Sequence, residues 1–157
     1  MLFGSSTIQH LLADHRRIRE YLEVMLDHKR DNGSVKLAFA GVLPLFISHN
    51  HREEKVIYAF LESQGEDLRR MAIEGDEEHA ILDGLVEELH DFTLSSEEWV
   101  LKAKIFAELL GHHFDGEERE MFPKLKKILT DELDEKLSAE YNGRSVKQTP
   151  PLSSVFH

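Results

Sequence analysis

The sequence predicts an all-α protein: an up-down-up-down antiparallel four-helix bundle with a short C-terminal helix and a tail. Apolar residues recur at helical spacing along most of the 157 residues. Four prolines and nine glycines leave room for long helices. Turn signals divide the periodic sequence into long segments with short connections, which is typical of such a bundle. A helical domain of another topology is the alternative.

The first helix is expected to begin at Ser6, which forms a capping-box pattern with Gln9. It should end at the turn signal of residues 31–33, where Gly33 suits a left-handed cap. The inward-facing residues are Leu11, Leu12, His15, Ile18, Leu22 and Met25.

The second helix is expected from about Ser34 to Gly65, with a kink at Pro44. Its inward-facing residues are Val42, Leu45, Phe46, His49, Glu53, Val56, Ile57 and Phe60. The third helix should cover residues 66–92, and Gly75 marks a place where it can bend or split. Its inward-facing residues are Leu68, Met71, Ala72, His79, Leu82, Val86 and Leu89.

The fourth helix is expected to follow the capping box of Ser95 and Glu98, and Pro123 should disturb its last part. Its inward-facing residues are Trp99, Phe106, Leu109, Leu110, His113, Glu117 and Met121. A short fifth helix should run from Thr130 to about Tyr141. Residues 1–141 therefore form one predicted domain, and the polar, turn-rich residues 142–157 form a tail.

Composition limits the classes of function. The net charge is −11 and no Lys/Arg-rich block is present, which argues against nucleic acid and anionic membranes as partners. The absence of cysteine excludes disulfides, thiolate metal ligands and thiol catalysis. Charge interrupts the first residues too soon for a signal-peptide core, and no apolar run approaches the ~18 residues of a membrane span. We therefore expect a cytoplasmic protein.

The spacing of four histidines reveals an internal repeat. His15 and His49 are 34 residues apart, and so are His79 and His113. The second pair follows the first by 64 residues, and Glu117 follows Glu53 by the same 64. The chain is therefore interpreted as two helical hairpins of one pattern.

The same spacing places the four histidines at one level of the bundle. In two antiparallel helices, residues at the same level are separated from the connecting turn by the same number of residues. The midpoints of successive histidines are residues 32, 64 and 96, and all three fall at predicted turns. An i, i+4 step keeps Glu53 and Glu117 on the faces of His49 and His113, about 6 Å along the axis.

This layer has the chemistry of a metal site. Buried carboxylates are costly without compensating charge, and no lysine or arginine lies on the inner stripes near them. Neutral imidazole and carboxylate without thiolate suit Fe, Mn or Zn. A metal-free network of His and Glu is the alternative. The candidate ligands are His15, His49, Glu53, His79, His113 and Glu117.

Other candidates fit less well. His112 has the wrong phase relative to Glu117, and His51 lies on the far side of its helix from His49. Glu54 and Glu118 lie one residue away from the inward-facing positions. They are therefore interpreted as groups that contact the metal ligands or lie on the surface, and either is long enough to reach a metal as an extra ligand. Tyr58 and Phe122 are interpreted as packing groups. The surface histidines are His10, His28, His90 and His157.

The pattern resembles the hemerythrin-like family, also called the HHE cation-binding domain. That family has one His on the first helix, H-x-x-x-E on the second, one His on the third and H-x-x-x-E on the fourth. The resemblance covers about residues 5–130 of this chain. The matching segments are "ADHRRI", "SHNHREEKVIY", "EEHAIL" and "HHFDGEEREMFP". The resemblance implies two Fe ions held by the four histidines and bridged by Glu53, Glu117 and an oxo, hydroxo or water group. Zn or Mn are possible substitutes.

The sequence departs from the oxygen-carrying hemerythrins. Those have His-x-x-x-His on the third helix, whereas Gly75 and Asp83 flank His79 at four residues. Their last carboxylate follows its histidine by five residues, not four. These departures favour binding or sensing of O2, NO, peroxide or iron over oxygen transport. An enzyme that consumes peroxide or NO, and a structural bundle that binds iron or zinc, are the alternatives. No separate general acid, base or substrate pocket is evident, which favours a binding protein.

Overall fold

The computed structural model describes residues 5–148, and all regular secondary structure in that range is helical. The all-α class is therefore confirmed for this part of the chain. The elements are α1 (Ser6–Leu26), α2 (Asn32–Arg52), the π-helix η1 (Glu53–Tyr58), α3 (Ala59–Leu61), α4 (Glu66–Glu88), α5 (Ser96–Gly116), the π-helix η2 (Glu117–Met121), α6 (Phe122–Ile128) and α7 (Asp131–Gln148).

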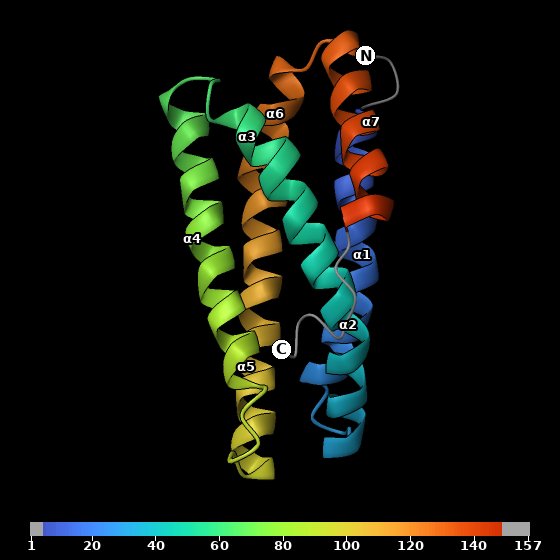
Figure 1. Cartoon of the computed structure of the whole chain (residues 1–157), viewed down its shortest axis with the longest axis vertical. Helices are drawn as coiled ribbons and strands as arrows, with labels where there is room; N and C mark the ends of the chain where they lie inside the picture. Colours follow the sequence, from blue (N-terminus) through green and yellow to red (C-terminus); the bar gives the residue numbers. More distant parts are fainter. Residues whose placement is uncertain (1–4, 149–157) are drawn as a thin grey trace.

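The long helices lie side by side along the long axis of the molecule, consistent with a helical bundle (Figure 1). The α1–α2 and α4–α5 connections lie at one end, and the α3–α4 connection lies at the other (Figure 1). α1 packs on α2 and α5, and α4 packs on α5. Pro44 lies inside α2 without ending it, and α4 runs through Gly75 without a break.

α1 begins at Ser6, as expected, whereas α2 begins at Asn32, two residues before the expected Ser34, and side chains other than the expected ones cap both helices. Ser5, not Ser6, caps α1 by accepting from the Ile8 N–H at 3.2 Å. Asp31 caps α2 by accepting from the Ser34 N–H at 2.8 Å, so Gly33 is helical and not left-handed. Gly65, with φ of 99°, is the position with positive φ among the described residues. The predicted Ser95 cap is confirmed, with the Glu98 N–H donating to it at 3.1 Å.

Each of the two π-helical segments begins at a candidate ligand, Glu53 or Glu117. A π-turn contains one residue more than an α-turn, so it rotates the following residues about the helix axis. The predicted stripe is wrong beyond η1 for this reason: Phe60 is only partly buried, whereas Tyr58 and Leu61 are at most 1% exposed. Leu109, also expected inside, is 40% exposed, because the buried face of α5 follows Phe106 and Leu110.

The fifth helix extends beyond its predicted end. α7 continues from Tyr141 to Gln148, so the predicted tail begins as helix, and residues 149–157 lie outside the described residues. α7 packs against α1 and α2, and Tyr141 is completely buried. Asp134 accepts hydrogen bonds from the backbone N–H groups of Ser6 and Thr7, at 2.9 and 3.0 Å. α7 is therefore part of the packed structure.

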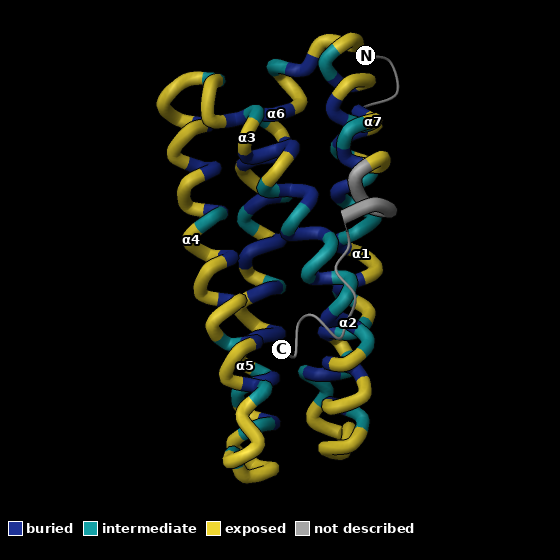
Figure 2. The backbone as a smooth tube through the Cα atoms, in the orientation of Figure 1, coloured by how far each residue is buried: buried dark blue, intermediate teal, exposed yellow. Residues whose placement is uncertain are grey.

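Two apolar clusters make the core, and the histidine layer lies between them. Figure 2 shows that buried residues recur along each of the long helices. The larger cluster joins α1, α2, α4 and α5 on the side of the α1–α2 and α4–α5 connections, and includes Ile18, Phe46, Leu82, Phe106 and Phe114. The other joins the opposite ends of these helices with η1, α6 and α7, and includes Leu11, Ile57, Leu68, Leu125 and Tyr141. Apolar packing on both sides keeps water from the layer and holds its side chains in place.

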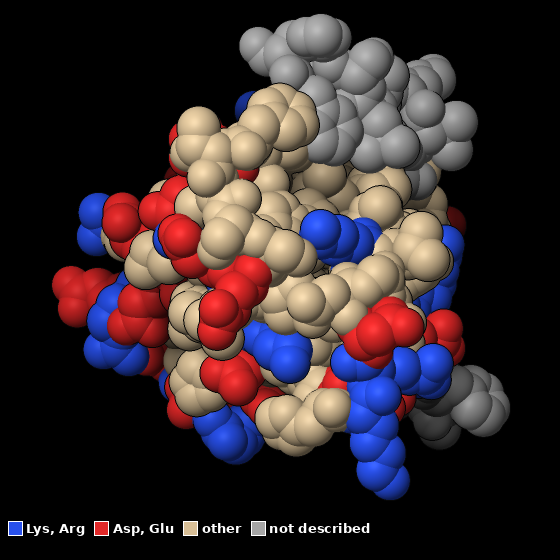
Figure 3. Space-filling model, turned by 90° about the horizontal axis from the view of Figure 1, so that it is seen from below, with Lys and Arg blue, Asp and Glu red and all other residues tan. Residues whose placement is uncertain are grey.

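The surface is charged. At the end where the α1–α2 and α4–α5 connections lie, charged residues of both signs are interspersed with uncharged residues (Figure 3). None of the described helices combines the length and apolar character needed to cross a membrane.

Candidate metal centre

The six residues singled out in the sequence lie together in the layer between the two apolar clusters. His15 comes from α1, His49 from the last turn of α2, His79 from α4 and His113 from the last turn of α5. Glu53 and Glu117 are the first residues of η1 and η2. None of the six is more than 4% exposed.

Each inner carboxylate faces imidazole Nε2 atoms from two sides. Glu53 Oε1 lies 3.2 Å from His79 Nε2, and Glu53 Oε2 lies 3.6 Å from His49 Nε2. The second carboxylate repeats the arrangement, since Glu117 Oε1 lies 3.4 Å from the Nε2 atoms of both His15 and His113. The Nε2 atoms of His79 and His113 are 3.0 Å apart.

These atoms divide into two groups, each compact enough to hold one cation. One group is His15, His49, Glu53 and Glu117, and the other is Glu53, His79 and His113. Within each group the ligand atoms lie within 4.8 Å of one another. Glu53 belongs to both groups, which is the position of a carboxylate that bridges two ions.

Most of the candidate donor atoms lack a hydrogen-bond partner. His15 Nε2, His49 Nε2, both oxygens of Glu53 and Glu117 Oε1 make no hydrogen bond within residues 5–148. Buried polar atoms normally have a partner, because leaving one unpaired costs about 1–3 kcal/mol. No ion pair joins either glutamate to a lysine or arginine in the same range. The residues therefore fit a bound cation.

A second set of carboxylates contacts the outward-facing Nδ1 atom of every histidine. His15 Nδ1 lies 3.0 Å from Glu118 Oε2, and His79 Nδ1 lies 3.1 Å from Glu54 Oε1. His49 Nδ1 lies 3.2 Å from Asp14 Oδ2, and His113 Nδ1 lies 3.3 Å from Glu78 Oε1. A carboxylate at Nδ1 orients the ring and keeps Nε2 free to bind a metal.

The outer carboxylates obey the 64-residue repeat. Glu118 follows Glu54, and Glu78 follows Asp14, by the offset that relates the histidines. The sequence reasoning placed Glu54 and Glu118 near the centre but did not identify Asp14 and Glu78. The sequence does contain a signal for these two residues, because Asp14 directly precedes His15 and Glu78 directly precedes His79.

Charge in the layer shifts the titration of its members in the metal-free protein. Burial alone would lower the pKa of His79, but hydrogen bonds to Glu53 and Glu54 and the charge of Glu53 raise it to about 9. Burial alone would raise the pKa of Glu53, but the neighbouring imidazoles hold it well below its usual value. Burial also opposes ionisation of Asp14, yet His49, Tyr141 and Arg52 lower its pKa to about 2.

Tyr58 packs in the core, as the sequence predicts, and it also brings a hydroxyl to the centre. Its O–H donates to Glu117 Oε2 at 2.6 Å. Gly75 makes room for it, because a Cβ at Gly75 would lie 2.4 Å from the Tyr58 hydroxyl oxygen. The counterpart of Tyr58 in the second hairpin is Phe122, whose ring stacks at 5.4 Å from that of His15.

A cavity of about 210 Å³ opens on the α4–α5 side of the layer and reaches His113 and Glu117. Gly116 lines it, and a Cβ added there would meet no atom within 4 Å. Glu74, Glu78 and Glu120 give it an acidic wall. The cavity therefore connects two candidate ligands to the space between α4 and α5.

The other histidines within residues 5–148 take no part in either group of candidate ligands. His112 and His28 are exposed, and His10, His51 and His90 are partly buried. His10 Nε2 lies 2.9 Å from Asn142 Nδ2. His157 lies outside the described residues.

Comparison with known proteins gives a family. Residues 6–125 match the sequence model of the family described as "Hemerythrin HHE cation binding domain". The match covers most of the chain and contains all six candidate ligands. A search of curated proteins found no significant match. A search of solved structures found none.

Proposed function

The chain belongs to the hemerythrin HHE cation-binding domain family, and from this premise we propose that it binds two iron ions at the six-residue layer. The observation that carries the proposal is the position of Glu53, whose two oxygens face histidines of both groups. The ligand assignment has His15, His49, Glu53 and Glu117 on one ion, and Glu53, His79 and His113 on the other. Glu117, beside both His15 and His113, is the second bridging carboxylate.

The proposal includes an up-down-up-down order of the four long helices. The connections alternate between the two ends of the molecule (Figure 1), as an antiparallel four-helix bundle requires. This order brings the last turns of α2 and α5 into one layer with the middle of α1 and α4. All four histidines then reach the same level although they are far apart in the sequence.

The donor set is compatible with iron. Four imidazoles and two carboxylates without thiolate suit Fe, Mn or Zn. Bound iron would supply redox chemistry and coordination positions for small ligands. The chain contributes two carboxylates to balance the charge, four outer carboxylates to orient the imidazoles, and apolar packing on both sides to exclude water.

We propose that the ligand of the loaded centre is small: O2, NO or peroxide. The cavity between α4 and α5 holds a few water-sized molecules and reaches His113 and Glu117. Its acidic wall disfavours anions and admits neutral molecules. Binding or sensing of such a ligand, or of iron itself, is the function that we propose.

An enzyme that consumes peroxide or NO is the second candidate, and Tyr58 is the observation that favours it. Burial and the charges of Glu117 and Glu53 raise the pKa of Tyr58, so its hydroxyl keeps a proton beside the centre. Peroxide consumption by the iron-loaded protein, compared with Tyr58→Phe and with free iron, separates the two roles. Turnover that exceeds free iron and falls in Tyr58→Phe would favour the enzyme.

Metal analysis of protein grown without added metal tests the proposed function. We expect iron as the major metal, near two per chain. Zinc as the major metal, with no gain of iron on reconstitution, would instead identify a structural zinc bundle.

A further inference from the structure

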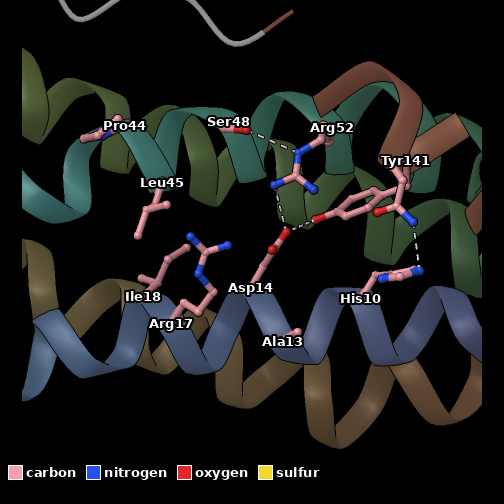
Figure 4. Close-up of a pocket in the computed structure, with 11 residues that line it drawn as sticks. His10, Ala13, Asp14, Arg17, Ile18, Pro44, Leu45, Ser48, Arg52 and Tyr141 are labelled. Atoms are coloured by element: carbon pink, nitrogen blue, oxygen red, sulfur yellow. Dashed lines mark hydrogen bonds and ion pairs between the residues drawn. The ribbon is translucent and has the colours of Figure 1, made fainter. Parts of the chain in front are cut away.

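A second cavity, of about 500 Å³, lies between α1 and α2 and is closed on one side by Tyr141 of α7. Figure 4 shows the guanidinium groups of Arg17 and Arg52 extending into it from opposite helices. Ile18 and Leu45 form an apolar end of the cavity (Figure 4). It lies outside the metal layer, because none of the six candidate ligands lines it.

The two arginines give this cavity a positive charge in a chain of net charge −11. Arg17 forms no ion pair and no hydrogen bond within residues 5–148. Arg52 is 9% exposed and is held on three sides. Its Nη2 lies 2.9 Å from Asp14 Oδ2, its Nε donates to Ser48 Oγ at 3.3 Å, and its guanidinium carbon lies 4.3 Å from the centre of the Tyr141 ring. The lining of the cavity thus contains two guanidinium groups and one carboxylate, that of Asp14.

The 64-residue repeat shows that the fold does not require this positive charge. The counterpart of Arg17 is Ile81, and the counterpart of Arg52 is Gly116. The outer carboxylate is nevertheless retained in both halves, as Asp14 and Glu78. The cavity beside Glu78 and Gly116 has four glutamates and one arginine, Arg119, in its lining. The arginine pair is therefore a specific feature of the α1–α2 side.

We propose that this cavity binds a small organic anion, whose carboxylate or phosphate lies between Arg17 and Arg52. A guanidinium group presents parallel N–H donors that match the two oxygens of such a group. Arg52 Nη1 makes no hydrogen bond within the described part of the chain, so it has a donor to offer. Ile18 and Leu45 provide a surface for a short carbon chain, which bare inorganic phosphate lacks.

The anion has a route to the metal layer through Asp14, and this part of the inference rests on the proposed function. Asp14 Oδ2 contacts Arg52, accepts from the Tyr141 hydroxyl at 2.5 Å and lies 3.2 Å from His49 Nδ1. An anion that engages Arg52 competes with Asp14 for the guanidinium. The contact between Asp14 and His49 then changes, and with it the environment of a ligand to one ion.

Calorimetric titration of the full chain tests the site, first in the metal-free protein. The probes are succinate, glycerol phosphate and inorganic phosphate. We expect saturable binding of at least one organic probe. Arg17→Gln should weaken it by about tenfold or more, the effect of losing about 1.4 kcal/mol. Arg16→Gln is the matched control, because Arg16 is exposed, adjacent, and absent from the cavity lining.

The outcomes of this titration decide separately which anion binds and whether the site exists. Preference for succinate or for glycerol phosphate identifies the anion as a carboxylate or a phosphate ester. Equal weakening by Arg16→Gln and Arg17→Gln, or no saturable binding of either organic probe, overturns the site. Ala13→Leu, which fills the cavity without a change of charge, should abolish binding, and unchanged binding in that variant also overturns it.

The iron-loaded protein tests the coupling separately. We expect addition of the organic probe to change the near-ultraviolet absorbance of the iron-loaded wild type but not that of iron-loaded Arg17→Gln. Binding without a change in absorbance would overturn the coupling and leave the site standing. If no two-iron centre forms, the proposed function fails, while the metal-free titration still decides whether the anion site exists.

Discussion

At the residue scale, each histidine of the layer lies between two carboxylates, one at Nε2 and one at Nδ1. The inner partners, Glu53 and Glu117, were predictable because they share a helix face with a histidine at i, i+4. The outer partners were harder to predict, since an acidic residue on the rim of a helix face looks like any solvated charge. Asp14 and Glu78 become identifiable only when the two hairpins are aligned.

The metal-free layer should be sensitive to alkaline pH. The pKa of His79 rises from 6.5 to about 9 in the folded protein, and those of His15 and His113 are also raised by the carboxylates around them, against the effect of burial. A raised pKa means that the protonated imidazole stabilises the fold. This stabilisation is complete below about pH 6.5 and is lost as the pH rises through about 9.

Metal binding needs neutral imidazoles, so it should release protons at pH 7. Titration of the metal-free protein with Co²⁺ in buffers of different ionisation enthalpy measures the number released. We expect net release at pH 7 that declines above pH 9. Binding at pH 7 without proton release would contradict this description of the layer.

At the element scale, the π-helical segments η1 and η2 determine which residues follow the glutamates into the core. The sequence predicted these helices but not their change of register. A π-turn depends on tertiary packing and has no single-residue signature comparable to a cap. The extra residue in the π-turn that begins at Glu53 rotates the residues after it about the helix axis. Tyr58 therefore faces Gly75, and Phe60 is only partly buried.

Gly75 should be required for the packing of α4 against η1. In Gly75→Ala the new Cβ would lie 2.4 Å from the Tyr58 hydroxyl oxygen. We expect a loss of about 1–3 kcal/mol in the free energy of unfolding, as for other overpacked cores. Gly84→Ala in the same helix is the control, because its Cβ meets no atom within 4 Å.

The control should gain about 0.5–1 kcal/mol, the usual effect of Gly to Ala inside a helix. Urea unfolding of the metal-free proteins gives both values. A Gly75→Ala variant as stable as Gly84→Ala would show that Tyr58 does not need the space.

The α4–α5 cavity should be the entry route to the layer. Gly116→Met places a side chain in this cavity, whereas Gly111→Met adds the same side chain to α5 away from it. We expect Gly116→Met to slow Co²⁺ uptake by about tenfold or more, corresponding to at least 1.4 kcal/mol of barrier. Stopped-flow absorbance measures the rate, and equal rates for the two variants would exclude this route.

At the scale of the whole molecule, two similar hairpins enclose one layer and differ in their outer faces. The α4–α5 face has an acidic cavity that reaches the candidate ligands. On the α1–α2 side, Arg52 pairs with Asp14, and α7 covers part of the surface. The four long helices were predictable from apolar periodicity. The extension of α7 beyond Tyr141 was not predictable, because its polar sequence carries little periodicity and its buried face is defined by α1 and α2.

Iron per chain in four Glu→Gln variants tests most directly the central claim, that Glu53 and Glu117 bridge two ions. Each substitution keeps the size of the side chain and removes its charge. At saturating iron the wild type should hold two ions, and Glu53→Gln and Glu117→Gln should hold one or none. Glu54→Gln and Glu118→Gln, altered at the histidine Nδ1 atoms, should still reach two ions with an affinity lowered by about 10–100-fold. A wild type that saturates at one ion, or a Glu54→Gln variant that loses iron while Glu53→Gln keeps two, would contradict the claim.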